Sequence, residues 1–335
     1  MKKKVILGIG AALLVLAAVI AVYLIVQEAQ PVENKQIVLI PKAKDEANEF
    51  WSALIAGAHM AADEKYVELT VKAPEREMDV DIQNSMILEA VEAKPDVIII
   101  APSSYQSSTA YIKKAIQAGI QVVLVDSEID EDIIEAKVAT DNFEMGKKLG
   151  EYMQLFIAEE PHIAVVSHVA QASTAIEREA GVRDGLGDYE KNIEQVVFSD
   201  SGYQSAYDLT IELLTEHPEI NMITGMNEYS SLGMARAVKY LGRQNQVAVF
   251  GVDSSVAQVQ LLEEGIYKAI VVQNPFNMGY LSVVQAVECI DGKKGKYTDS
   301  QSALVTKTDM YSKENQKILF PFIGQQAKES YGSED

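Results

Sequence analysis

Short runs built only of apolar residues recur along this chain, and a longer stretch with helical spacing separates each run from the next. Residues 37–40, 97–100 and 122–125 are the clearest runs in the first half. A strand that is apolar at every position, rather than at every second one, needs cover on both faces. Strands of that kind alternating with helices are typical of a parallel sheet with helices on both sides, so the pattern predicts the α/β class.

The same alternation begins again in the second half. Apolar runs at 163–166 and 247–252 and the segment 193–198 predict strands, with helical patterns between them. The segment Val-Val-Leu-Val-Asp-Ser at 122–127 also has an echo at 247–254, where another apolar strand ends in Asp-Ser. An echo this short also arises by chance between buried strands. A chain of 335 residues is long enough for two domains, and we expect two similar α/β halves.

The N-terminus carries the strongest local asymmetry in the sequence. Lysines at positions 2–4 precede residues 5–26, which contain no charged side chain. Such a stretch is long enough to cross the roughly 30 Å hydrocarbon core of a bilayer as a helix. A cleaved secretory signal has the same charge order, but its apolar part is usually only about 7–15 residues long. In either case the positive-inside rule keeps the lysines in the cytoplasm and exports the rest of the chain.

We therefore expect a cytoplasmic basic stub at 1–4, a transmembrane anchor at 5–26 and a linker at 27–35. The chain would then lie in the cell membrane as a single-pass protein whose main domain is outside the cytoplasm. The alternative is a secreted or periplasmic protein that signal cleavage releases from the membrane.

The charge and cysteine counts exclude several classes of function. With 29 basic and 49 acidic side chains the net charge is -20, which argues against a nucleic-acid partner because binding phosphates needs a positive surface. The single cysteine, Cys289, excludes an internal disulfide, and no Cys/His cluster provides a zinc site. The sequence also lacks a phosphate-binding glycine loop and a serine nucleophile elbow. We expect no metal, no cofactor and no enzymatic activity.

Polar residues that directly follow the apolar runs are the candidate ligand-binding groups, because ligands bind beyond the carboxyl ends of parallel strands. Two adjacent aromatic residues near the start of the first predicted helix after the linker join them. Carboxylates and amides can each bridge two hydroxyl groups, and an aromatic ring can cover the apolar face of a sugar. The candidates of this kind are Asn48, Phe50, Trp51, Asp126, Ser127, His168, Asn227, Asp253, Ser254, Gln273 and Asn274.

The candidates also have plainer interpretations. Asp126, Asn227 and Asp253 belong to residue types that often cap helices or form turns after strands. Phe50 and Trp51 would equally suit a hydrophobic core. The residue types alone therefore leave both readings open.

Taken in order, the candidates resemble the pattern of ribose-binding-type sugar receptors. The similarity is carried by Asn48-x-Phe50-Trp51, Asp126, Thr140-Asp141-Asn142, Glu177-Arg178, Asn227, Gly251-Val252-Asp253 and Gln273-Asn274-Pro275. These receptors belong to the type I periplasmic binding protein family, which shares its core with LacI-type repressors, and the similarity spans about residues 36–311. The resemblance implies an α/β fold of two doubly wound, Rossmann-like domains joined by a three-segment hinge, preceded here by one transmembrane helix.

The resemblance also implies roles for the matching positions. Phe50 and Trp51 would sandwich a sugar ring from the first domain, with Tyr203 facing them from the second. Hydrogen bonds to the sugar hydroxyls would come from Asn48, Asp126, Arg178, Asn227, Asp253 and Gln273. Without the resemblance, Arg178 would equally suit an exposed helix, because Glu177 and Glu179 flank it.

The family's hinge would place chain crossings near residues 140–141, 273–274 and 303. The boundaries that follow are subdomain 1 at 36–140 and 274–302, subdomain 2 at 141–273 and 303–311, and a C-terminal tail at 312–335.

Departures from the pattern point away from ribose itself. Lys42 and Lys44 add cations near the mouth of the expected cleft, and Glu49 replaces a common proline. Ser127, also a candidate contact, follows Asp126 where ribose-type receptors usually have arginine, and this removes a forked contact to hydroxyls. Tyr203 adds a hydroxyl where phenylalanine is usual. We therefore expect the ligand to be a sugar or sugar-like polyol with a different pattern of hydroxyls.

The function implied by the resemblance is an extracytoplasmic receptor that closes on its ligand and delivers it to an ABC permease. The expected anchor suggests an alternative, a membrane-tethered sugar sensor that signals to a partner histidine kinase. An enzyme on the same fold is a remote alternative, with Asp126 and Asp253 as an acid/base pair. A transcription regulator would need an N-terminal helix-turn-helix and a basic face, which the sequence lacks.

Overall fold

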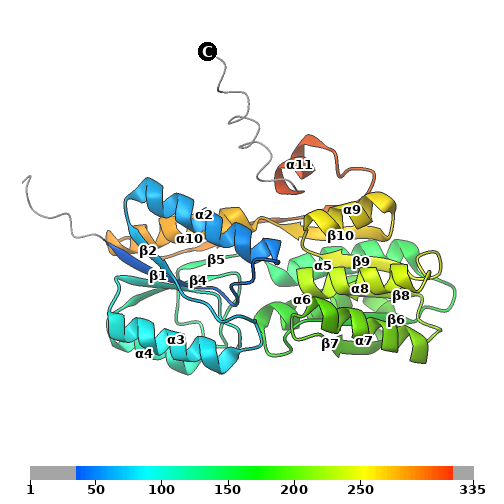
Figure 1. Ribbon diagram of the computed structural model, residues 1–335, viewed down its shortest axis with the longest axis horizontal. Coiled ribbons are helices and arrows are strands. Elements are labelled where there is room, and N and C mark those ends of the chain that lie inside the picture. Colours follow the sequence, from blue (N-terminus) through cyan, green and yellow to red (C-terminus); the bar gives the residue numbers. More distant parts are fainter. Residues whose placement is uncertain (1–34, 320–335) are drawn as a thin grey trace, which may run out of the picture. The chain divides into compact units, whose positions relative to one another are not determined.

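The computed structural model describes residues 35–319, which form two lobes, each built on one six-stranded sheet (Figure 1). The sheet of lobe 1 has the strand order β11-β5-β4-β3-β1-β2, and all its neighbouring strands are parallel. Its strands are β1 (Gln36–Ile40), β2 (Glu68–Val71), β3 (Val97–Ile100), β4 (Gln121–Val125), β5 (Lys137–Ala139) and β11 (Tyr297–Asp299).

Helices cover both faces of the lobe 1 sheet, as fully apolar strands require. Figure 1 shows α2 and α10 over one face and α3 and α4 over the other, and a separate buried apolar cluster fills the space on each side. These helices are α2 (Glu49–Lys65), α3 (Val80–Ala93), α4 (Thr109–Gln117) and α10 (Pro275–Ile290).

Lobe 2 repeats this arrangement with the strand order β12-β10-β9-β8-β6-β7. Its strands are β6 (Ile163–Ser167), β7 (Ile193–Phe198), β8 (Met222–Gly225), β9 (Ala248–Val252), β10 (Tyr267–Gln273) and β12 (Ser302–Val305). Only the β10–β12 pair is antiparallel among the described strands.

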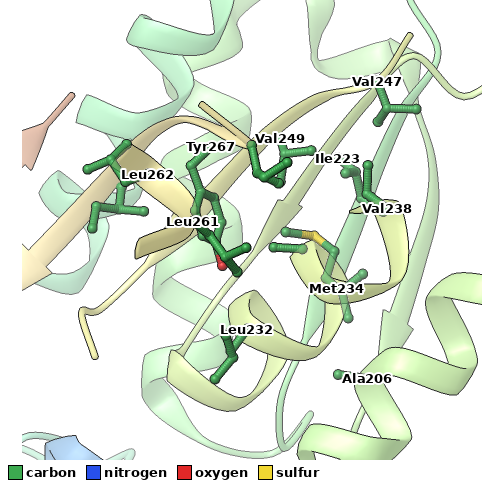
Figure 2. Close-up of a cluster of buried hydrophobic side chains, with 14 of the residues drawn as sticks. Ala206, Ile223, Leu232, Met234, Val238, Val247, Val249, Leu261, Leu262 and Tyr267 are labelled. Carbon is green, nitrogen blue, oxygen red and sulfur yellow. The ribbon is translucent and has the colours of Figure 1, made fainter. Parts of the chain in front are cut away.

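The lobe 2 sheet is also covered on both faces. The helices are α5 (Asn142–Met153) and α6 (Ser173–Leu186) on one face, and α7 (Tyr203–Glu216), α8 (Glu228–Tyr240) and α9 (Val256–Glu264) on the other. The cluster under α7, α8 and α9 contains Met234, Val249 and Leu262 (Figure 2). Tyr267 lies in the same cluster. Its buried hydroxyl group is not left without a partner, because it donates to the Ser231 carbonyl at 2.7 Å. Short 3-10 turns at Gln154–Phe156 and Gly187–Asn192 and a last helix, α11 (Lys313–Leu319), complete the described chain.

The two lobes therefore match in strand order, as the repeated sequence pattern predicts, and differ in the direction of the edge strands β11 and β12. The two segments that echo each other in sequence form β4 and β9, which occupy the same position in the order of their sheets. The chain passes from one sheet to the other three times, after β5, after β10, and between β11 and β12.

Close helix pairs set the positions of the two helices that carry candidate site residues. In lobe 1, a Cβ added to Gly279 of α10 would lie 1.8 Å from the Leu54 carbonyl oxygen of α2. In lobe 2, a Cβ on Gly146 of α5 would lie 2.2 Å from the Arg178 carbonyl oxygen of α6. Only glycine allows these backbones to approach so closely, so α10 fixes α2 and α5 fixes α6.

The predicted alternation of strands and helices is confirmed, and the sequence reading missed several short elements. These are β5, β11, β12, α9 and α11. Across residues 35–319 no helix is long and apolar enough to span a membrane. The predicted stub, anchor and most of the linker, and the end of the predicted tail, lie outside the described residues.

Candidate ligand-binding site

A small cavity lies where the carboxyl ends of the strands in the two lobes meet. Its volume is about 20 Å³, which leaves room for roughly one water molecule. The lining residues are Lys42, Asn48, Phe50, Trp51, Glu77 and Asp126 from lobe 1, and His168, Thr174, Arg178, Asn227, Glu228 and Asp253 from lobe 2. Seven of the ten residues that the sequence selects for ligand binding are in this lining.

Asp126 and Asp253 stand at equivalent points, directly after β4 and β9. Both have a left-handed backbone, with φ of 65° and 70°, a conformation that aspartate tolerates better than most residues. The Oδ2 atom of Asp126 accepts a hydrogen bond from Lys42 Nζ at 2.8 Å, and both side chains are almost fully buried. Asp253 instead accepts from Gln273 Nε2 at 2.6 Å and from the Glu228 N–H at 3.0 Å. Burial raises the pKa of the Asp253 carboxyl above its usual value.

A chain of polar contacts runs from Lys42 across the site. Its ammonium group also donates to Thr174 Oγ1 at 3.3 Å, and Thr174 Oγ1 lies 2.9 Å from His168 Nε2. Burial, with Arg178 and Lys42 nearby, holds the pKa of His168 well below its usual value. His168 is therefore neutral, and Lys42 and Arg178 are the cations of the cavity lining.

Arg178 is not an exposed helix charge, since only 2% of the residue is accessible to solvent. Its Nε donates to Asn142 Oδ1 at 2.8 Å and its Nη1 to the Met226 carbonyl at 2.7 Å. The same Nη1 lies 4.0 Å from Asp253 Oδ2. These contacts fix the guanidinium plane at the lobe 2 side of the cavity.

The two aromatic residues meet edge to face. The ring centroids of Phe50 and Trp51 are 5.0 Å apart and their planes are 86° from parallel, so only one of the two rings can lie flat against a ligand ring. The indole Nε1 of Trp51 donates to Glu77 Oε1 at 2.7 Å, and Ser201 of lobe 2 donates to Glu77 Oε2 at 2.5 Å. Burial raises the pKa of Glu77.

The interpretation of Asn227 as a helix cap is confirmed, and Asn48, for which no cap was predicted, also caps a helix. Asn48 Oδ1 accepts from the Trp51 N–H at 2.9 Å and begins α2, while Asn227 Oδ1 accepts from the Ser230 N–H at 2.9 Å and begins α8. Both residues also line the cavity. Their caps fix the first turns of the helices that face the site from the two lobes.

Three of the predicted ligand contacts lie outside the lining. Ser127 is buried and donates to the Pro102 carbonyl at 3.0 Å. Tyr203 uses its hydroxyl on protein groups, donating to Glu228 Oε1 at 2.5 Å and approaching the Ala47 carbonyl at 3.2 Å. Gln273 donates from Nε2 to Asp253 Oδ1 and so holds that carboxyl group in place. The buried Oε1 of Gln273 has no hydrogen-bond partner among residues 35–319.

The lining also contains residues that the sequence reading did not select as ligand contacts. His168 follows β6 and is a candidate from its place at a strand end, although the resemblance gives it no ligand contact. Lys42 follows β1, so the rule of polar residues at strand ends points to it as well. Glu77 lies in a turn before α3 that has no distinctive pattern. Thr174 and Glu228 lie in the first turns of α6 and α8, where such residue types are ordinary. Within residues 35–319, no cluster of three or more potential metal ligands is present.

Comparison with known proteins extends this picture. The family described as "Periplasmic binding protein domain" matches residues 37–294. The D-ribose/D-allose-binding protein of Pseudomonas aeruginosa is 25% identical over 273 residues, covering 79% of this chain and 85% of its own length. The ribose import binding protein of Escherichia coli is also 25% identical, with 74% of this chain and 82% of its own covered.

Solved structures give the same result at the level of the fold. A sugar transporter from Clostridium phytofermentans has a TM-score of 0.77 and 40% identity, covering 81% of this chain and 98% of its own. An ABC transporter solute-binding protein from Agrobacterium vitis with bound D-fucose has a TM-score of 0.80 and 29% identity, with 85% and 100% covered. Two matched α/β lobes with a polar cavity at their strand ends, and a family match over most of the described residues, make this chain a member of the periplasmic binding protein family.

Proposed function

We propose that this chain is an extracytoplasmic solute-binding protein that captures a sugar or sugar-like polyol between its lobes and delivers it to an ABC transporter. The observation that carries the proposal is the lining of the cavity, which combines carboxylates, a lysine, a guanidinium group and an aromatic pair, all buried. The relatives named above are described as sugar-binding or sugar-transport proteins, which supports the same class of ligand.

The charges in the lining favour a ligand without net charge. Lys42 is already paired with Asp126, and Arg178 lies beside Asp253, so neither cation needs an anionic ligand as its partner. Hydroxyl groups both donate and accept hydrogen bonds, so a polyol can contact carboxylate and cation alike. The proposed contacts to the ligand are Asn48, Phe50, Trp51, Asp126, Arg178, Asn227 and Asp253, supported by Ser127, Tyr203 and Gln273.

The lobes must separate for such a ligand to enter, because a sugar needs much more room than the present cavity. We propose that the three passages of the chain between the sheets act as the hinge. The boundaries given above for subdomains 1 and 2 are part of this proposal. Residues 1–26 would export the domain, either as an anchor or as a cleaved signal, which membrane fractionation and N-terminal sequencing of the mature protein distinguish.

Calorimetric titration of the full-length protein with a panel of pentoses, hexoses and inositols tests the function. We expect tight binding of at least one of them and recovery of that compound chemically unchanged, which would also exclude the enzyme alternative. Replacing Arg178 with methionine should abolish the binding. Absence of binding by every member of the panel would refute the proposed ligand class. None of the relatives named above is described as a histidine-kinase partner, so we propose transport rather than sensing.

A further inference from the structure

One cavity residue has contacts that a ligand-binding role does not explain. Glu228 begins α8 of lobe 2, is 1% exposed, and directs its carboxyl group across to lobe 1. Its Oε1 accepts from the Glu49 N–H at 3.2 Å and its Oε2 from the Phe50 N–H at 2.9 Å. These are the first two N–H groups of α2, which have no partner within their own helix.

Glu49 makes the reverse contact. Its side chain extends from lobe 1 to lobe 2, where Oε1 accepts from the Val256 N–H at 3.0 Å. Val256 is the first residue of α9. Each lobe therefore supplies a carboxyl group to a helix N-terminus of the other lobe, where the first N–H groups need an acceptor from outside their own helix.

Glu228 is not needed by its own helix. The cap of α8 is Asn227, which forms a reciprocal capping box with Ser230. The Glu228 carboxyl could therefore turn away from lobe 1 without loss to α8. Its observed direction is explained by the N–H groups of α2.

We propose that Glu228 and Glu49 form a reciprocal latch between the lobes, and that Glu228 is the positioning residue for the aromatic side of the proposed sugar site. This inference rests on the proposed function for its link to sugar, but not for the latch itself. Glu228 accepts from the Phe50 N–H, and Trp51 follows directly in the chain. Closing the latch therefore fixes the positions of the Phe50 and Trp51 rings at the cavity. Asn48, which caps the same turn, is set by the same contact.

The groups around Glu228 support its dependence on lobe 1. No lysine or arginine of residues 35–319 pairs with it, and its strongest stabilising contacts are Tyr203 and the two N–H groups of α2. Opening the lobes removes the N–H groups and leaves only Tyr203. The titratable groups that interact with it are Tyr203 from α7, Asp253 after β9 and Tyr267 from β10. The other titratable or charged groups of the same cavity lining are Lys42, Glu77, Asp126, His168 and Arg178.

The test is a distance measurement between lobes on the full-length chain in detergent. Spin labels are attached through Glu92→Cys in lobe 1 and Lys191→Cys in lobe 2, both exposed, in a Cys289→Ala background. We expect Glu228→Ala to change the distances between the two labels from those of the closed form to those of a form with the lobes apart. Glu49→Ala, on the surface, should change them in the same direction by less. Glu212→Ala, an exposed glutamate of α7, is the matched control and should change nothing.

For any sugar that binds, Glu228→Ala should accelerate dissociation by about tenfold while changing the association rate little, because hydrogen bonds to a charged or buried carboxyl hold the closed form. Unchanged distances in both latch variants would overturn the proposal. If Glu228→Ala fails to fold, the Glu49→Ala distances and those of Tyr203→Phe decide the question. The distance measurement needs no sugar, so a failure of the latch and a failure of the proposed function remain distinguishable.

Discussion

Asp126 and Asp253 occupy equivalent positions in the two lobes, and they differ in the groups that bind their carboxyl oxygens. Both follow an equivalent strand, both have a left-handed backbone and both are buried. Asp126 has a lysine of its own lobe at 2.8 Å, whereas the nearest cation to Asp253 lies at 4.0 Å. Asp253 relies on an amide and a backbone N–H instead.

The difference shows that two lobes with the same strand order can have different charged partners at equivalent positions. In lobe 1 the carboxylate is paired with a cation of its own lobe, although that lysine also donates to Thr174 of lobe 2. In lobe 2 the carboxyl supports the first residue of α8, and so it is connected to Glu228 and the contact between lobes. We expect lobe 1 to be sensitive to loss of its cation and lobe 2 to be sensitive to pH and to helix position.

Removing the lysine should have the largest effect. Lys42→Met leaves Asp126 buried without its cation, and breaking a buried pair in this way costs about 3–5 kcal/mol of unfolding free energy. Gln273→Met, the corresponding change at Asp253, removes one hydrogen bond to a carboxyl and should cost about 1.5–3 kcal/mol. Urea unfolding of both variants gives the comparison. Equal losses would show that the two aspartates do not differ as described.

The pH dependence of closure should be the next largest effect, and we expect its largest part to come from Glu228 of lobe 2. Burial raises the pKa of Glu228 to about 8 from an ordinary value of 4.5. A carboxyl whose pKa is higher in the closed form takes up a proton on closure, so closure is favoured at low pH and weakens as pH rises from about 4.5 to about 8.

We expect the closed fraction of the wild-type protein to fall between pH 6 and pH 9, with the closure equilibrium changing by up to about a hundredfold. Glu228→Gln, which stays neutral, should remove most of this dependence, and Glu212→Gln should keep it. The spin-label distances measure all three. A Glu228→Gln profile as steep as the wild type would assign the titration to another group, such as Asp253.

Helix position should also affect the two lobes differently. Gly146→Ala and Gly279→Ala each force apart a close helix pair, and overpacking of this kind costs about 1–3 kcal/mol of stability. Gly146→Ala presses on the Arg178 backbone, so it should also weaken sugar binding through lobe 2. Gly279→Ala presses on α2 at Leu54, one turn beyond the aromatic pair. Thermal unfolding measures the loss of stability, and calorimetry measures the affinity for sugar. If both variants keep the wild-type affinity, the packing of these helices does not determine the geometry of the site.

The sequence predicts the fold well because fully apolar strands leave few alternatives to a covered parallel sheet. The elements it misses are short: β5 has three residues and α9 has nine, too few for a periodic pattern to be distinctive. At the site, Asp126 and Asp253 are predictable because each ends a strand. Glu77 is not, because it reaches the cavity from an irregular loop, held by Trp51 and Ser201, which only the tertiary structure brings to it.

The serines that follow the two aspartates should show the smallest effect. Ser127 donates to the Pro102 carbonyl, while Ser254 has no hydrogen bond to any group of residues 35–319 and is only partly buried. Ser127→Ala should therefore cost about 1 kcal/mol of stability, and Ser254→Ala less than about 0.5 kcal/mol. Because Ser127 is committed to lobe 1 and lies outside the cavity lining, its alanine variant should bind sugar as the wild type does. A marked loss of affinity in Ser127→Ala would instead mean that opening and ligand entry rotate this hydroxyl into the site, and Ser127 would then be a ligand contact, as predicted from the sequence.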